Sequence, residues 1–346
     1  MNNDNCLLNI LRFDAQNVNK RVSLSALEGS EVTITGATGL VGVNLVAALI
    51  FYNYKLAKTP IRINAVSFSK PDGFMAKLFN DSNVSSLFGD ITDQNFVNAI
   101  PMSEYIIHSA GYAQPGKFMD DRIKTISINT TATIELLKRL RPDGSFVFLS
   151  SSEVYSGSSS LNNNERDIGS TDPSHPRACY IEGKRTGETI INAARASGVK
   201  AASARLALAY GPGTKPNDLR VMNQIIAKGL NNEISLLDGG EAIRTYGYVT
   251  DVVTMLFNIL IKNESSVYNI GGKSVVTIRD LAVKVGELME VAVRIPETDS
   301  YMPHAPNSVG LDLTRVEGEY GNILYTDIDV GLINTIKWIR ALQSES

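Results

Sequence analysis

Cysteine and histidine are both scarce in this sequence of 346 residues. The two cysteines, Cys6 and Cys179, are too few for a disulfide framework or a cysteine-based zinc site, so we expect a reducing, cytoplasmic setting. The three histidines, His108, His175 and His304, do not have the spacing of metal ligands, and the place of His108 at the end of an expected strand favours a structural role. The sequence therefore predicts no metal site.

The chain also lacks a basic excess and a long apolar run. Lys and Arg number 33 against 36 Asp and Glu, a net charge of −3, so there is no surplus of cations for a nucleic-acid backbone. The longest apolar stretch, near residues 45–52, falls far short of the roughly 20 residues that a membrane span needs. The asparagine-rich N-terminus has no basic-then-apolar segment of a signal peptide. With 43% hydrophobic residues, the chain is expected to form one large globular domain or two smaller ones, with no nucleic-acid or membrane partner.

Short β-branched runs alternate with helix-like segments from residue 31 to residue 208. Strands are expected at 31–35, 61–68, 105–109, 145–150 and 201–208, and helices at 40–51, 126–140 and 180–197. This alternation predicts an α/β fold in which a parallel sheet has helices on both faces. The preceding residues, 1–30, are expected to form an arm with a short helix near 7–11 that packs on the domain surface.

Two later stretches depart from this alternation. Residues 156–171 are rich in Ser, Asn and Gly without an apolar period, which predicts a mobile loop and a candidate lid. Beyond Tyr210, Gly211-Pro212-Gly213 leads into a helix expected at 221–229. We expect a main domain at 31–210, with a return segment near 240–272, and a smaller mixed α/β region over 211–346.

The segment Thr35-Gly36-Ala37-Thr38-Gly39-Leu40-Val41-Gly42 places three glycines three residues apart between a strand and a helix. A side chain at Gly36 would obstruct the turn, one at Gly39 would keep the backbone from a pyrophosphate, and one at Gly42 would hold the helix off the sheet. The pattern predicts a dinucleotide-binding, Rossmann-type doubly wound sheet.

Two further positions bear on the dinucleotide. Asp90, in Gly89-Asp90-Ile91, is expected to accept a hydrogen bond from the adenine amino group at the end of the third strand. After the second strand, where a carboxylate would bind the ribose 2′-hydroxyl of NAD, the chain has Ser67-Phe68-Ser69-Lys70. Lys70 can meet a 2′-phosphate or simply be a solvated loop lysine, so NAD is expected and NADP is left open.

A Tyr-x-x-x-Lys pair, Tyr180 and Lys184, lies one helical turn apart and follows Ser151-Ser152-Glu153 in the chain. A lysine cation beside a phenol favours the phenolate, so we expect the pKa of Tyr180, about 10 for an isolated phenol, to fall toward physiological pH. Tyr180 then removes a hydroxyl proton from the substrate, with Ser151 sharing the hydrogen bond, while hydride leaves the same carbon.

With Ile107-His108-Ser109-Ala110, these motifs resemble the extended short-chain dehydrogenase/reductase family that acts on nucleotide sugars, over residues 31–340. Four stretches are most similar to UDP-glucuronate decarboxylases: 119–130 (MDDRIKTISINT), 177–185 (RACYIEGKR), 210–212 (YGP) and 238–240 (DGG) with Arg244. The resemblance implies that residues 211–346 mostly bind the nucleotide sugar. It also implies a homodimer through a four-helix bundle built from the helices at 126–140 and 180–197.

The resemblance implies a role for each of several residues. Ser151, Ser152, Glu153, Tyr180 and Lys184 are the expected catalytic residues. The expected cofactor-binding residues are Gly36, Thr38, Gly39, Leu40, Val41, Gly42, Ser69, Lys70, Asp90, Ile91, Ser109, Ala110, Asn129, Tyr180 and Lys184. Arg177, Arg220, Arg244 and Tyr248 are expected to bind substrate, with Arg220 and Arg244 holding the diphosphate through guanidinium forks.

The reaction that follows oxidation at C4 of the sugar depends on the neighbours of Ser151. A 4-epimerase needs no carboxylate at Glu153, which counts against that activity. A 4,6-dehydratase of the dTDP-glucose type would have Asp where this chain has Ser152, a poor acid, although GDP-mannose dehydratases resemble the Ser-Glu form. A uronic acid oxidised at C4 is a β-keto acid and loses carbon dioxide without an acid on its leaving group. UDP-glucuronate decarboxylation is therefore the leading hypothesis and 4,6-dehydration the alternative.

A non-catalytic dinucleotide-binding protein is a third hypothesis, from a different class. An inert binder has no need of Ser151, Tyr180 and Lys184 together, which argues against it.

Overall fold

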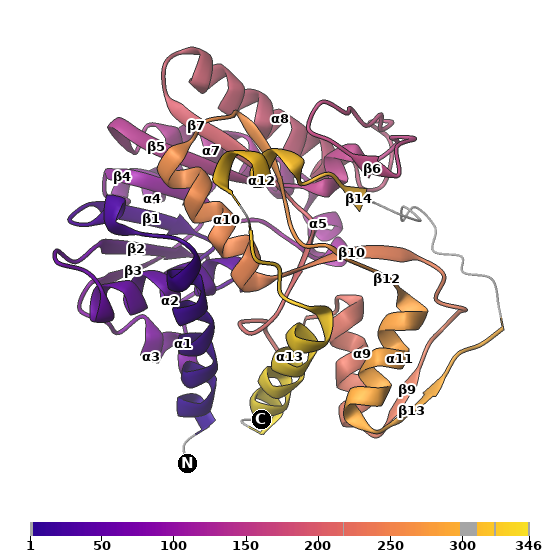
Figure 1. Ribbon diagram of the computed structural model, residues 1–346. Coiled ribbons are helices and arrows are strands. Elements are labelled where there is room, and N and C mark those ends of the chain that lie inside the picture. The colour runs from indigo at the N-terminus through magenta and orange to yellow at the C-terminus, as the bar shows by residue number, and fades with distance from the viewer. Residues whose placement is uncertain (1–2, 217, 298–309, 322, 345–346) are drawn as a thin grey trace.

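Seven parallel strands form the central sheet of the computed structural model, which describes residues 3–216, 218–297, 310–321 and 323–344 (Figure 1). The strand order is β11 (Val267–Ile270), β7 (Lys200–Leu206), β5 (Leu140–Ser151), β4 (Ser103–His108), β1 (Glu31–Thr35), β2 (Arg62–Ser67) and β3 (Val84–Phe88). All pairings between these strands are parallel. The predicted Rossmann-type α/β fold is confirmed, and the order reverses between β1 and β4, where such sheets bind ligands.

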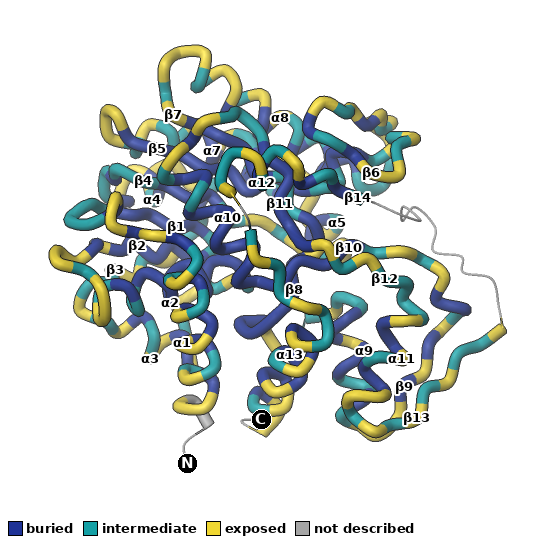
Figure 2. Tube along the Cα trace, viewed as in Figure 1, coloured by how far each residue is buried: buried dark blue, intermediate teal, exposed yellow. Residues whose placement is uncertain are grey.

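Helices cover both faces of the sheet. One face packs against α2 (Leu40–Lys55) and α10 (Val249–Lys262), and the other against α7 (Thr131–Leu137) and α8 (Ala178–Ala196). Short helices at the edges and ends of strands are α3 (Gly73–Leu78), α4 (Gln94–Ala99), α5 (Pro115–Asp120) and α6 (Arg122–Asn129). Figure 2 shows the deepest burial along the strands and α10, as expected for strands covered on both sides.

The C-terminal part forms smaller sheets and helices beside the carboxyl ends of the strands. A three-stranded sheet has the order β12 (Ser274–Thr277), β10 (Ile243–Tyr248) and β8 (Leu208–Tyr210). The other elements here are α9 (Val221–Leu230), β9 (Glu233–Ser235), α11 (Ile278–Met289), β13 (Ala292–Arg294), α12 (Thr314–Tyr320) and α13 (Ile328–Gln343). In Figure 1, α9, α11, β9 and β13 lie together at the end of the molecule away from β1–β3.

The N-terminal arm is a long helix, α1 (Asn3–Arg21), followed by a short 3₁₀ turn at Ser25–Leu27. Its buried side chains Leu7, Leu11, Ala15 and Val18 recur every three or four residues and pack in the same core as α2 and α10. The short helix expected at 7–11 was wrong in length, because the polar residues between these apolar positions hid the stripe.

The helix expected at 126–140 is also different in the structure, because α6 ends at Asn129 and α7 begins at Thr131. The hydroxyls of Thr130 and Thr133 donate to carbonyls four residues earlier, a bond that bends helices. The chain then enters β5 at Leu140.

The segment 156–171, predicted to be a mobile loop, contains a strand. β6 (Asn162–Asn163) pairs in parallel with β14 (Gly310–Leu311). The side chain of Asn163 donates to the carbonyl of Gly310, and Asn269 in β11 donates to the carbonyl of Asn163. Residues far along the chain therefore hold this segment, which sequence periodicity did not indicate.

Candidate active site

The glycine turn joins β1 to α2 at the point where the strand order reverses. Gly36 has φ of +70°, and a Cβ there would lie 2.7 Å from the carbonyl oxygen of Ser109. A Cβ at Gly42 would overlap the carbonyl oxygen of Gly36, so this glycine lets α2 approach its own turn. Gly39 is exposed, and a Cβ there would meet only the Gly36 oxygen, at 3.2 Å. The turn thus presents bare backbone at the N-terminus of α2, which fits a pyrophosphate.

The end of β4 supports this turn from the side. The hydroxyl of Ser109 donates to the carbonyl of Thr35 at 2.6 Å, and the amide of Ala110 donates to the hydroxyl of Thr35 at 3.2 Å. His108 is fully buried between the Thr35 hydroxyl and the Ile128 carbonyl, and burial lowers its pKa to about 3. Its neutral ring donates to the Ile128 carbonyl, so His108 has a structural place in the fold.

At the expected adenosine end, Asp90 already has partners within the protein. Its carboxylate pairs with Lys124 at 2.6 Å and accepts hydrogen bonds from the amide and hydroxyl of Thr92. Burial raises the pKa of Asp90, but these bonds outweigh it and hold the pKa below its usual value. The Lys124 ammonium also lies 4.5 Å from the centre of the exposed Phe68 ring. An adenine amino group would therefore share Asp90 with Lys124.

The remaining expected cofactor residues lie around these two points. Thr38 lies in the turn, Leu40 begins α2, and Val41 is buried. Ile91 is buried beside Asp90, while Ser69 and Lys70 are exposed after β2.

Ser151, Tyr180 and Lys184 come together where β5 ends against α8. The Ser151 hydroxyl is hydrogen bonded to the Tyr180 hydroxyl, and the Ser151 oxygen also accepts from the Glu153 amide at 3.2 Å. The Lys184 ammonium donates to the carbonyl of Leu149 at 2.6 Å and lies 5.8 Å from the centre of the Tyr180 ring. The three side chains therefore form one cluster, as the spacing of these residues in the sequence predicts.

The sequence predicts that Lys184 lowers the pKa of Tyr180, and this prediction is wrong. Burial and, to a smaller extent, the Glu153 carboxylate raise the pKa of Tyr180 to about 12, against the Ser151 hydrogen bond and the charges of Arg177 and Arg220. Burial likewise lowers the pKa of Lys184 to about 7. The ammonium points to a backbone carbonyl, and removal from water opposes the charged form of both groups.

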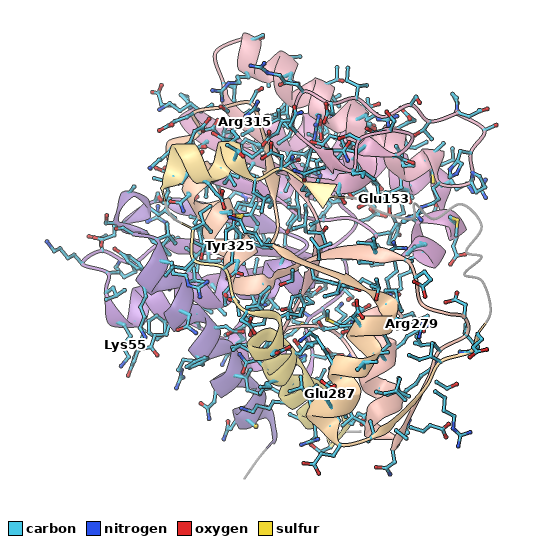
Figure 3. The ribbon with its side chains drawn as sticks, turned by 45° about the vertical axis from the view of Figure 1, so that its right-hand side comes forward. Lys55, Glu153, Arg279, Glu287, Arg315 and Tyr325 are labelled. Atoms are coloured by element: carbon cyan, nitrogen blue, oxygen red, sulfur yellow. The ribbon has the colours of Figure 1, made fainter. Side chains whose placement is uncertain are left out.

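Glu153 and three arginines form the charged part of the site. Glu153 lies on the 3₁₀ turn η2 (Ser152–Tyr155) and forms an ion pair with Arg177, the residue before α8. Burial raises the pKa of Glu153, against the charges of Arg177 and Arg244 on β10. Glu153, labelled in Figure 3, lies just beyond the carboxyl end of β5.

Arg220 approaches the same place from the start of α9, since its charge acts on both Tyr180 and Tyr246. Its guanidinium is held by Asp218 at 2.6 Å and donates to the carbonyl of Ala209. The charges of Arg177, Arg220 and Arg244, which come from three separate segments, therefore act together on Tyr180 and Glu153.

Phe118 on α5 is a member of this site that the sequence did not reveal. Its ring stacks on Tyr180 with centroids 4.6 Å apart and planes at 12°, and Arg177 lies 5.6 Å from its centre. A single Phe in a short loop helix carries no motif signal. Its contact with Tyr180 depends on the packing of α5 against α8.

Of two other predicted site residues, Asn129 lies beside α8, whereas Tyr248 lies among other helices. Asn129 is 1% exposed beside Gly183, and its side-chain oxygen has no protein partner, which leaves an acceptor for a ligand group. Tyr248 is also buried, but its hydroxyl contacts Asp14 of α1 and Asn334 of α13. The structure therefore makes Tyr248 a packing residue between helices and does not bring it into the cluster.

No group of three or more His, Cys, Asp or Glu side chains in the described ranges is arranged to hold a metal ion, and His304 lies outside the described residues. None of the described helices combines the length and apolar character required to cross a bilayer.

A family model described as "NAD dependent epimerase/dehydratase family" matches residues 32–271. The chain belongs to this family. It is 29% identical over 330 residues to UDP-glucuronic acid decarboxylase 1 of Danio rerio, across 93% of this chain and 76% of the relative. It is 27% identical over 293 residues to UDP-glucuronic acid decarboxylase 6 of Arabidopsis thaliana, across 84% of this chain and 83% of the relative.

Solved structures share the fold at lower identity. The epimerase Mth375 of Methanothermobacter thermautotrophicus aligns with a TM-score of 0.79 and 20% identity, covering 98% of this chain and 96% of that one. DesIV, a dTDP-glucose 4,6-dehydratase of Streptomyces venezuelae solved with NAD and TYD bound, aligns with a TM-score of 0.77 and 20% identity, covering 91% and 98%. These likenesses agree with the family assignment and leave the reaction open.

Proposed function

We propose that this enzyme of the epimerase/dehydratase family oxidises C4 of the sugar in UDP-glucuronate and then decarboxylates it. The observation that carries the proposal is the gathering of Arg177, Arg220 and Arg244 around Tyr180 and Glu153. A uronic acid linked to a diphosphate brings negative charge at both ends of the sugar, and guanidinium groups suit both. A neutral hexose needs cations only at its diphosphate.

The first step uses the cluster at the end of β5. Tyr180 accepts the proton of the C4 hydroxyl as its phenolate, while Ser151 remains hydrogen bonded to it. Burial opposes this ionised form, and the Ser151 hydrogen bond and the charges of Arg177 and Arg220 favour it. The family description, the DesIV structure and the glycine turn all support NAD as the cofactor. When bound, NAD would supply the hydride acceptor. Gly36, Gly39 and the start of α2 would hold its pyrophosphate, and Asn129 can accept a hydrogen bond from a ligand group beside it.

The second step distinguishes decarboxylation from the alternative. A β-keto acid loses carbon dioxide without an acid at the leaving group, whereas a 4,6-dehydratase needs a base at C5 and an acid at the 6-hydroxyl. The Arg177 charge opposes proton uptake by Glu153, and Ser152 is a poor acid. The ion pair is better suited to orienting a substrate carboxylate through Arg177, which leaves Arg220 and Arg244 for the diphosphate. Dehydration remains the second candidate because Glu153 retains a raised pKa.

We also propose a homodimer. Ile123, Ile126 and Ile134 on α6 and α7 are 75%, 39% and 43% exposed. Burying them against a second copy removes apolar surface from water, and light scattering of the purified protein would test this.

Incubation with UDP-glucuronate, dTDP-glucose and GDP-mannose, followed by mass spectrometry, tests the reaction. Decarboxylation lowers the mass of the first compound by about 44 units, whereas dehydration lowers that of either other compound by about 18. Tyr180→Phe should abolish either change. An unaltered UDP-glucuronate beside a dehydrated dTDP- or GDP-sugar would replace the first candidate with the second.

A further inference from the structure

Three consecutive residues at the end of β5 each bind a different residue of α8. The carbonyl of Leu149 accepts from Lys184, and the hydroxyl of Ser150 donates to Glu188 at 2.5 Å. The hydroxyl of Ser151 is hydrogen bonded to Tyr180. Because residues 180, 184 and 188 are each one turn apart, one face of α8 is fastened to the strand end at three successive points.

Of the three α8 residues in these contacts, Tyr180 and Lys184 are predicted catalytic residues and Glu188 is not. Glu188 is nevertheless held by more side-chain hydrogen bonds than either of them. Arg205 on β7 donates to both of its carboxylate oxygens, at 2.7–3.2 Å. Arg205 also donates to the hydroxyl of Tyr155 and to the carbonyl of Glu165. Glu188 is 6% exposed, so its charge is buried and fully paired.

The Glu188–Arg205 pair connects α8 to a hydrogen-bonded network of neighbouring strands. Tyr155, which follows Glu153 on η2, donates to the side chain of Asn269 in β11 at 2.7 Å. The amide of Asn269 in turn donates to the carboxylate of Glu165. The network therefore joins β5, β7, β11, η2 and α8 behind the site, and Glu188 is where it meets the helix that carries Tyr180.

We propose that Glu188 is a positioning residue for the reaction: through Ser150 and Arg205 it fixes α8 against the end of β5, so that Tyr180 and Lys184 meet Ser151 and Leu149 in the reactive arrangement. This inference rests on the proposed oxidation step. It goes beyond that step in naming a residue that touches neither substrate nor cofactor. Loss of the Glu188 anchor should allow small shifts of Tyr180, and misplacement of about 1 Å costs reactions roughly 100-fold.

Glu188 also supplies negative charge near Lys184. The titratable or charged groups around that ammonium are Tyr180 and Glu188 on its own helix, His108 on β4 and, behind Glu188, Arg205 on β7. The Glu188 charge opposes the effect of burial on Lys184. Removal of this charge should therefore lower the pKa of Lys184.

The test compares Glu188→Gln and Ser150→Ala with Thr189→Ala, an exposed neighbour on the same helix. Ser150→Ala keeps the buried ion pair intact, so it should fold even if Glu188→Gln is unstable. We expect kcat to fall roughly 10- to 100-fold in both variants with KM little changed. The double variant should be no slower than the worse single one, because both remove the same anchor. Thr189→Ala should match the parent protein.

A second readout does not depend on turnover. With ¹³Cε-labelled lysine, NMR titration should show the pKa of Lys184 lowered in Glu188→Gln and unchanged in Thr189→Ala, with Lys184→Arg identifying the signal. A folded Ser150→Ala variant with full kcat, additive losses in the double variant, or an unshifted Lys184 would overturn the proposal. A parent protein that turns over none of the three nucleotide sugars would instead refute the proposed function, and the Lys184 titration would still report on Glu188.

Discussion

The ring of Phe118 stacks on that of Tyr180 with 4.6 Å between centroids and 12° between planes. Phe118 is 1% exposed, and its carbonyl accepts from the hydroxyl of Thr125 at 3.1 Å, so α5 is held in place behind the phenol. This contact gives Tyr180 one orientation before substrate binds.

Replacing Phe118 with Leu should lower kcat roughly tenfold, because the phenol loses the flat surface that orients it. Steady-state kinetics with the substrate identified by mass spectrometry would measure the change. Phe146→Leu is a matched control, since Phe146 is equally buried in the sheet core but lies five residues before Ser151. Both variants should lose similar thermal stability, and equal losses of kcat would contradict a specific role for Phe118.

Replacing Glu153 with Gln should lower the pKa of Tyr180. The Glu153 carboxylate opposes the phenolate, and its removal also leaves the Arg177 charge uncompensated beside the phenol, so both effects have the same sign. Ultraviolet difference titration against the Tyr180→Phe background would detect the ionisation of this phenol. Glu182→Gln, which removes a carboxylate paired with Arg185, should leave it unchanged. An equal shift in both variants would argue against a local effect of Glu153.

Alanine at two glycines should separate cofactor binding from folding. Gly39→Ala places a methyl group where only the Gly36 oxygen is close, so the protein should fold but bind NAD at least roughly tenfold more weakly, because the methyl group faces the pyrophosphate. Gly42→Ala drives a methyl group into the turn and should destabilise the protein by about 1–3 kcal/mol. Calorimetric titration with NAD and thermal unfolding would measure the two effects. The prediction fails if Gly39→Ala binds NAD normally.

Asp14 should make stability fall as pH rises from about 4 to about 7. Burial raises its pKa to about 7, against the Tyr248 hydrogen bond and the Arg21 charge, so the folded chain holds a proton that the unfolded chain, with a pKa of 3.8, has released. Folding is therefore favoured most below this window and the loss is complete above it. Asp14→Asn should stabilise the protein at pH 8 by roughly 2–4 kcal/mol, with no gain near pH 4.

Denaturant unfolding of Asp14→Asn at several pH values would measure this difference. Glu287→Gln, on the exposed face of α11 (Figure 3), should be neutral throughout. A gain that does not depend on pH would mean that Asn improves packing rather than relieving a buried charge.

Local sequence determined the elements whose signals lie within a few residues. The strand–glycine–helix order at 31–51 appears as β1, the turn and α2, because each glycine is required by contacts inside that short unit or with the adjacent strand end. The Tyr180–Lys184 spacing likewise fixes a shared helix face, since one turn of a helix has constant geometry. Family membership followed from these same short motifs.

Only the tertiary structure determined the pKa values in the site and the residues that hold its side chains in place. The ionisation of Tyr180 depends on how much water its surroundings exclude, which reversed the effect expected from a neighbouring lysine. Phe118, Glu188 and the partner of Asp14 acquire their roles from segments tens to hundreds of residues away. A motif records which residues are adjacent along a helix or turn, whereas burial and charge pairing depend on distances that exist only after the chain has packed.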